Sequence, residues 1–189
     1  PGVKIDLPIH REAKQFLQRL IEKLKGKTLP DWDGWAGYCR DLESQNPMVT
    51  PAQKKDPIDL YYFMSRLDSL SDAHHVFVTD AGSNYYVGGQ VYKFEHGQRE
   101  ITSGAFASMG LSIPLAIGAG VADRKTQVLA VTGDGSLELN LQELKTMSHY
   151  DLDIKLFVIN NGGYVSMRNW QDGFFDGRRI ETAEATEQE

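Results

Sequence analysis

Two short segments late in the chain, each directly after an apolar run, combine glycine with carboxylate, amide and hydroxyl side chains. Gly133-Asp134-Gly135-Ser136 follows the apolar residues 128–131, and Asn160-Asn161-Gly162-Gly163 follows residues 154–159. Glycines let the backbone approach a ligand closely. The N–H groups of Gly135 and Ser136 would open a helix, and such a helix start favours a bound phosphate.

Asp134 adds a carboxylate at the same place, and a carboxylate beside a phosphate is repulsive unless a cation lies between them. The pattern therefore predicts a divalent metal, and Mg²⁺ fits best because it takes oxygen ligands and is often shared with phosphates. Asn161 could supply an amide oxygen, and the flexible Gly162-Gly163 could turn a carbonyl inward. Either segment alone is typical of an ordinary turn or loop, and the specificity comes from their spacing of one strand–helix–strand unit.

The elements expected around these segments alternate between strands and helices. Apolar runs predict strands at residues 76–78, 128–131 and 154–159, and residues 100–102 are a further strand candidate. Apolar stripes predict helices at 10–25 and from 56–57 onward, and further helices are expected at 85–91, 109–122 and 137–150. A short helix is also expected in the otherwise irregular, proline-bearing stretch 28–57. Continuous apolar strands alternating with helices predict an α/β domain, a parallel sheet with helices on both faces. In such sheets ligands bind beyond the carboxyl ends of the strands.

Composition excludes several classes of partner and compartment. The net charge is −6 and there is no basic run, so we expect no nucleic acid partner. No apolar run approaches the roughly 20 residues that cross a bilayer, and we identify no signal peptide. A single cysteine, Cys39, fits a reducing compartment and thus a cytoplasmic location. Cys39 is expected to be buried on a helix, and the five histidines show no spacing typical of metal ligands.

Gly133-Asp134-Gly135 followed by Asn160-Asn161 resembles the thiamine-diphosphate motif. Two further segments resemble acetolactate synthase-like enzymes: residues 101–110 resemble the segment that holds the aminopyrimidine ring, and residues 79–84 resemble the upstream turn that contacts the diphosphate. The likeness runs from about residue 56 to residue 175. It implies that residues 1–27 are the end of a central domain, 28–55 a linker, 56–180 a C-terminally incomplete thiamine diphosphate-binding domain, and 181–189 a frayed tail.

The resemblance also implies a role for individual residues. Asp134, Asn161 and the carbonyl of Gly163 would hold Mg²⁺, and the carbonyl of Ala107 would hold the cofactor's amino group, although the family usually has glycine there. Met109 would lie beneath the bent cofactor; without the resemblance it would be taken as a core residue. The other residues implied to contact the cofactor are Gly82, Ser83, Asn84, Ser108, Gly133, Gly135, Ser136 and Tyr164.

The reaction implied is decarboxylation of a 2-oxo acid such as pyruvate, followed by carbon–carbon bond formation. Trp170 falls where acetolactate synthases place a substrate-pocket tryptophan, but it could equally be a packing aromatic. Residues 161–168 look more like relatives that join a two-carbon unit to a keto-sugar in surface-polysaccharide pathways. An alternative of a different functional class is a non-catalytic scaffold protein that has this fold.

The glutamate that activates the cofactor in this family lies in a pyrimidine-binding domain, and no segment of this chain resembles that domain. The catalytic glutamate is therefore expected outside this chain, either in the rest of the protein or in a partner subunit of a homodimer or homotetramer. On this view the 189 residues are an incomplete piece that would be inactive alone.

Overall fold

The computed structural model describes residues 2, 4–55, 59–179 and 182. The chain divides into two compact units, Pro1–Pro47 and Met48–Glu189, and each is described here by itself. The helix start predicted at residues 56–57 lies outside the described residues, as does the frayed tail predicted for 181–189, apart from Thr182.

The first unit contains the two helices predicted for it, α1 (Ala13–Leu24) and α2 (Asp33–Gln45). Helix α1 begins where the Glu12 side chain accepts the N–H groups of Lys14 and Gln15, which are the bonds that an N-cap side chain makes. Neither helix buries a side chain. For this reason the expectation that Cys39 is buried is wrong: the thiol is exposed on α2.

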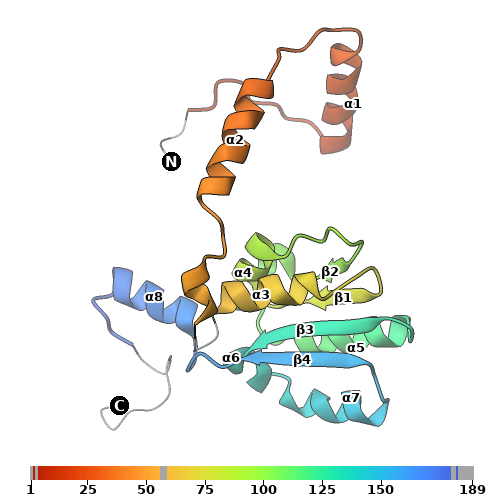
Figure 1. The fold of residues 1–189 in the computed structure, drawn as a ribbon, viewed down its shortest axis with the longest axis vertical. Helices are drawn as coiled ribbons and strands as arrows, with labels where there is room; N and C mark the ends of the chain where they lie inside the picture. The colour runs from red at the N-terminus through yellow and green to blue at the C-terminus, as the bar shows by residue number, and fades with distance from the viewer. Residues whose placement is uncertain (1, 3, 56–58, 180–181, 183–189) are drawn as a thin grey trace. The chain divides into compact units, whose positions relative to one another are not determined.

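The second unit is built on a four-stranded parallel sheet (Figure 1). The strands are β1 (His75–Val78), β2 (Arg99–Ile101), β3 (Gln127–Gly133) and β4 (Ile154–Ile159), and they lie in the order β2-β1-β3-β4. The helices are α3 (Leu60–Ser69), α4 (Ser83–Val91), α5 (Ser112–Ala122), α6 (Asp134–Glu138), α7 (Leu144–His149) and α8 (Val165–Phe174). Short 3₁₀ turns, η1 (Pro51–Lys54), η2 (Gly104–Phe106) and η3 (Leu141–Glu143), complete the unit.

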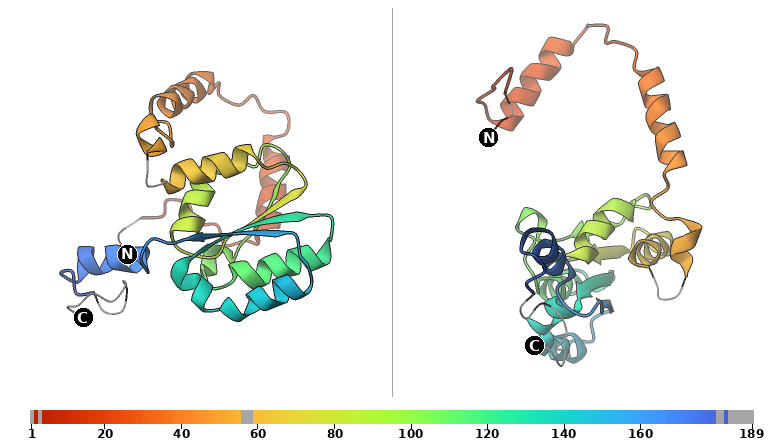
Figure 2. Two further views of the ribbon diagram at one scale, coloured as in Figure 1. Left: turned by 60° about the horizontal axis from the view of Figure 1, so that its bottom comes forward. Right: turned by 90° about the vertical axis from the view of Figure 1, so that its left-hand side faces the viewer.

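Both faces of the sheet are covered, as the continuous apolar strands predicted. Alternate residues of one strand point to opposite faces, and in β1 Phe77 joins a core with Met64 of α3 and Val91 of α4. On the other face Val76 and Val78 join a core with Ala116 of α5. In the left view of Figure 2 the sheet accordingly lies between the yellow helix α3 and the green and cyan helices α5 and α7.

Most element bounds differ from the sequence prediction by a few residues, and three differences are larger or affect the site. Helix α5 begins at Ser112 rather than at 109. The helix predicted over 137–150 is broken into α6, η3 and α7. The break falls at Asn140, whose backbone leaves the helical region (φ −138°, ψ 30°) and whose side-chain amide donates to the Gly110 carbonyl at 2.7 Å. Helix α8 was not predicted at all.

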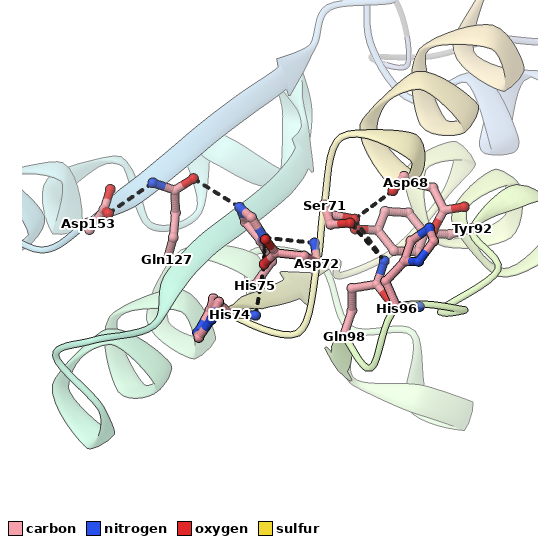
Figure 3. A network of polar contacts seen from close by, with 10 residues as sticks. All are labelled: Asp68, Ser71, Asp72, His74, His75, Tyr92, His96, Gln98, Gln127 and Asp153. Atoms are coloured by element: carbon pink, nitrogen blue, oxygen red, sulfur yellow. Dashed lines mark hydrogen bonds and ion pairs between the residues drawn. The ribbon is translucent and has the colours of Figure 1, made fainter.

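A polar network lies at the amino ends of the strands, away from the predicted ligand edge (Figure 3). The His75 ring lies between Asp72 (Nδ1 to Oδ1, 2.9 Å) and Gln127 (Nε2 to Oε1, 3.2 Å). Nearby, the buried Tyr92 hydroxyl lies 2.5 Å from the Ser71 hydroxyl. These side chains fasten the start of β1 to its neighbours. Within the described ranges, no helix is both long enough and apolar enough to span a bilayer.

Candidate functional site

A pocket opens beyond the carboxyl ends of β1, β3 and β4, where the topology predicts a ligand site. Three helices, α4, α6 and α8, begin at this pocket, so their unpaired N–H groups and the positive ends of their dipoles gather there. The lining residues are Ala81, Gly82, Ser83, Asn84, Tyr86, Ala107, Met109, Gly133, Asp134, Gly135, Ser136, Ile159, Asn161, Gly163, Tyr164, Val165, Ser166 and Met167.

Asp134 is held in place by three backbone N–H groups. Its Oδ1 accepts from Gly135 at 2.8 Å, and its Oδ2 accepts from Asn161 at 3.1 Å and from Gly163 at 2.9 Å. A carboxylate offers about four acceptor positions, so these bonds leave about one, on Oδ1. Asp134 can therefore give one oxygen to a cation without losing any of the hydrogen bonds that orient it.

The loop after β4 has the geometry that its two glycines allow. Gly162 and Gly163 have φ angles of +73° and +105°, which L side chains rarely adopt. This backbone conformation lets the N–H groups of Asn161 and Gly163 both reach the Asp134 carboxylate. The carbonyl of Gly163 accepts one N–H, from Val165 at 2.9 Å, and retains a second lone pair.

A fully buried carboxylate, Asp80, lies beneath the pocket and joins segments that are far apart in sequence. Its Oδ1 accepts from the Ala81 N–H and from the Asn84 side-chain amide, at 2.7 and 3.0 Å, and its Oδ2 accepts from the Thr132 hydroxyl at 3.1 Å. The backbone carbonyl of Asp80 accepts from the Ser103 hydroxyl at 3.1 Å. Asp80 thus ties the turn after β1 to the end of β3 and to the segment that leads to Ala107.

Ala107 has left-handed backbone angles, φ 45° and ψ 44°. This conformation costs an L residue roughly 1–2 kcal/mol and gives a physical reason why glycine is usual at this place in the resembled family. The neighbouring segment is fastened to the residue that follows α6, because Asn140 donates to the carbonyl of Gly110.

Gly135 is packed against the ring of Tyr164. A Cβ atom at this position would lie 2.3 Å from Tyr164 Cε1 and 2.8 Å from Cζ, whereas a Cβ at Gly133 would meet nothing within 4 Å. The two glycines of the motif therefore have different roles. Gly135 makes room for Tyr164, and Gly133 leaves open space on the pocket side.

The pocket brings together all but two of the residues predicted from the sequence. The exceptions are Ser108, whose N–H donates to the Ser103 hydroxyl at 2.9 Å, and Trp170, which stacks on Phe174 with ring centroids 4.7 Å apart and is 59% exposed. For all of these residues, contact with a cofactor, a metal or a substrate stays a prediction. Asn84 lines the pocket, but its side-chain NH₂ group donates to Asp80 and to the Val131 carbonyl, which leaves its backbone N–H for an anion.

Sequence reasoning did not single out several residues that line or support the pocket. Helix α8 contributes Val165, Ser166 and Met167, and its Arg168 contacts the loop after β4. The spacing of Trp170 and Phe174, four residues apart, was the signal for this helix in the sequence. In the structure the two rings stack. In the part of the chain that the structure describes, no three His, Cys, Asp or Glu side chains gather as metal ligands.

Comparison with known proteins agrees with this geometry. A family model described as "Thiamine pyrophosphate enzyme, C-terminal TPP binding domain" matches residues 80–189, more than half of the chain. The acetolactate synthase large subunits of Buchnera aphidicola (subsp. Schizaphis graminum) and Lactococcus lactis are each 31% identical to this chain over 180 residues, which cover 93% and 95% of it. That of Cyanidium caldarium is 32% identical and covers 94%.

The chain spans 30–31% of the length of these three relatives. The match to the family begins at Asp80, so it includes all three strand-end segments that line the pocket. The chain therefore belongs to the thiamine pyrophosphate enzymes and contains a TPP-binding domain like that of acetolactate synthase.

Proposed function

We propose that this chain forms the diphosphate- and Mg²⁺-binding part of an enzyme that decarboxylates a 2-oxo acid and joins the remaining carbons to an acceptor. The observation that carries the proposal is the Asp134 carboxylate, oriented by three N–H groups and left with one free acceptor position beside the start of three helices. The acetolactate synthase relatives supply the reaction class. We also propose that the enzyme is cytoplasmic.

The oxygen atoms that could bind the metal suit a hard cation. Asp134 offers a carboxylate oxygen, Gly163 a carbonyl and Asn161 an amide oxygen, all of which line the pocket, and oxygen ligands of this kind are those that Mg²⁺ prefers. The N–H groups at the starts of α4 and α6, around Ser83 and Ser136, would bind the diphosphate. When bound, thiamine diphosphate supplies the carbanion chemistry, and the residues of this chain bind and orient it.

We propose that part of the site comes from another domain or subunit. Among the described residues that line the pocket, Asp134 is the one carboxylate, and it is committed to the metal end. Apolar side chains are exposed around the pocket, with Phe106 91%, Tyr86 57% and Met167 53% exposed. Exposed apolar surface of this kind marks an interface. We propose that a pyrimidine-binding domain, from the rest of the protein or from a partner subunit in a homo-oligomer, covers the pocket and supplies the activating glutamate.

Calorimetric titration of the intact protein with thiamine diphosphate and Mg²⁺ tests the cofactor assignment. We expect Asp134→Asn to weaken binding by more than about 100-fold, since even groups that only orient a metal ligand are worth 10–100-fold. Asp153→Asn is the matched control, because Asp153 lies before β4, at the opposite edge of the sheet, and bonds Gln127 and Lys155. Equal binding by the Asp134 variant and the unchanged protein would refute the assignment.

Product analysis with isotope-labelled pyruvate then identifies the reaction. Acetolactate as the sole product supports the proposal. Transfer of the two-carbon unit only to a nucleotide-linked ketose would replace it with a role in surface-polysaccharide synthesis. Cofactor binding with no turnover of any 2-oxo acid would indicate a non-catalytic scaffold.

A further inference from the structure

The side chain of Arg168, on helix α8, is bound to the main chain of the loop after β4. Its Nη2 donates to the carbonyl of Asn161 at 3.1 Å, and its Nη1 donates to the carbonyls of Gly162 and Thr182, the latter at 2.9 Å. The residue is half-buried and does not itself line the pocket. Its role therefore concerns the loop and not a ligand directly.

The loop lies between two opposite charges. The carbonyls of Asn161 and Gly162 are bound by Arg168 on one side, while the N–H groups of Asn161 and Gly163 are bound by Asp134 on the other. The carbonyl of Gly162 and the N–H of Gly163 belong to one planar peptide group. When Arg168 fixes the direction of that carbonyl, it also fixes the N–H that points at Asp134.

We propose that Arg168 is a positioning residue for the metal, acting through this loop. By holding the carbonyls of Asn161 and Gly162, it keeps the two N–H groups on Asp134 Oδ2, so that Oδ1 retains the free position for the cation. It also holds Asn161 and Gly163, the other proposed oxygen donors, at a fixed place beside Asp134. The planar guanidinium suits this role because it presents several N–H donors in a rigid fork, which an ammonium group lacks.

This inference rests on the proposed function, and its test measures metal binding rather than turnover. The intact protein is titrated with Mn²⁺, a paramagnetic replacement for Mg²⁺, in the presence of thiamine diphosphate, and free Mn²⁺ is followed by electron paramagnetic resonance. We expect Arg168→Met to raise the Mn²⁺ dissociation constant by about 10–100-fold, the usual effect of removing a group that orients metal ligands. The spectrum of bound Mn²⁺ should also broaden, which a loss of stability alone would not cause.

Arg179→Met is the matched control. Arg179 is also an arginine bonded to α8, through Asp172 (Nε to Oδ1, 2.8 Å), and this contact holds the pKa of the Asp172 carboxyl below its usual range. The pair does not contact the metal loop, so Mn²⁺ affinity should stay within about twofold of that of the unchanged protein, as expected for a surface ion pair.

Arg168→Lys keeps the charge and the apolar stem and so serves if Arg168→Met does not fold. It should still lose at least about threefold in Mn²⁺ affinity, because one ammonium cannot reproduce the guanidinium fork. If a folded Arg168 variant binds Mn²⁺ as tightly as the unchanged protein, the positioning role is wrong and the proposed function survives. If the unchanged protein binds neither Mn²⁺ nor thiamine diphosphate, the proposed function fails and this inference fails with it.

Discussion

The close packing of Gly135 against Tyr164 predicts that a side chain at position 135 destabilises the domain. A methyl group at position 135 would lie 2.3 Å from Tyr164 Cε1, whereas carbon atoms in contact are normally about 3.5–4.0 Å apart. The ring must therefore move by more than about 1 Å. Its main chain is tied down, since the Tyr164 N–H donates to the Thr182 carbonyl at 3.1 Å, so the ring must leave its preferred side-chain conformation.

Overpacking that forces side chains off their rotamers costs about 1–3 kcal/mol, and an approach of 2.3 Å to a ring whose main chain is anchored places Gly135→Ala near the upper end of this range. Alanine gains back about 1 kcal/mol of helix propensity over glycine in α6. We therefore expect Gly135→Ala to lower the free energy of unfolding by about 2 kcal/mol, which for a chain of this length shifts the melting temperature down by about 4–8 °C.

Gly133→Ala provides the control, because a Cβ there meets nothing within 4 Å and the backbone φ is −81°. Its free energy of unfolding should change by less than about 1 kcal/mol. Melting temperatures measured by circular dichroism without cofactor compare the two variants. The double variant Gly135→Ala with Tyr164→Ala should lose little beyond Tyr164→Ala alone. Equal melting temperatures for the two glycine variants would refute the packing argument.

Two further substitutions test other parts of the domain. Ala107→Gly should raise the free energy of unfolding by about 1 kcal/mol, measured by urea denaturation, because it relieves the left-handed backbone at φ 45° and this relief exceeds the added entropy of the unfolded chain. Burial raises the pKa of the Tyr92 hydroxyl above its usual 10.0, so its contribution to stability is complete below pH 10 and is lost as the pH rises through the raised value. Tyr92→Phe removes the hydrogen bond between the Tyr92 and Ser71 hydroxyls and should cost about 1 kcal/mol at pH 7. Urea denaturation of this variant at several pH values should show a weaker loss of stability above pH 10 than in the unchanged chain.

The strands and the ligand edge could be predicted from the sequence because their signals are local. Residues 154–159 are apolar apart from Lys155, and β4 has the same bounds. The segment that begins at Gly133 comes directly at the end of β3, where the parallel topology requires a ligand site. Most of the residues predicted to contact the cofactor or metal consequently line one pocket.

The features that were not predicted depend on contacts between residues that lie far apart in the sequence. The helix predicted over 137–150 is interrupted because Asn140 bonds the carbonyl of Gly110, which is far away in sequence. Asp80 could be recognised as part of a turn, but only the fold shows that its carboxylate reaches Thr132 on β3. The partners of Arg168 are main-chain carbonyls, and a sequence gives no sign of which carbonyls a side chain will meet.

The hydrogen bond from Asn140 to Gly110 has a consequence for the cost of binding a ligand in the pocket. Asn140 follows α6, the helix that starts with Asp134, while Gly110 follows Met109. The bond therefore links the segment that carries Asp134 to the segment that carries Met109, and both of these residues line the pocket. A link that is already made before a ligand enters leaves the protein less freedom to lose on binding.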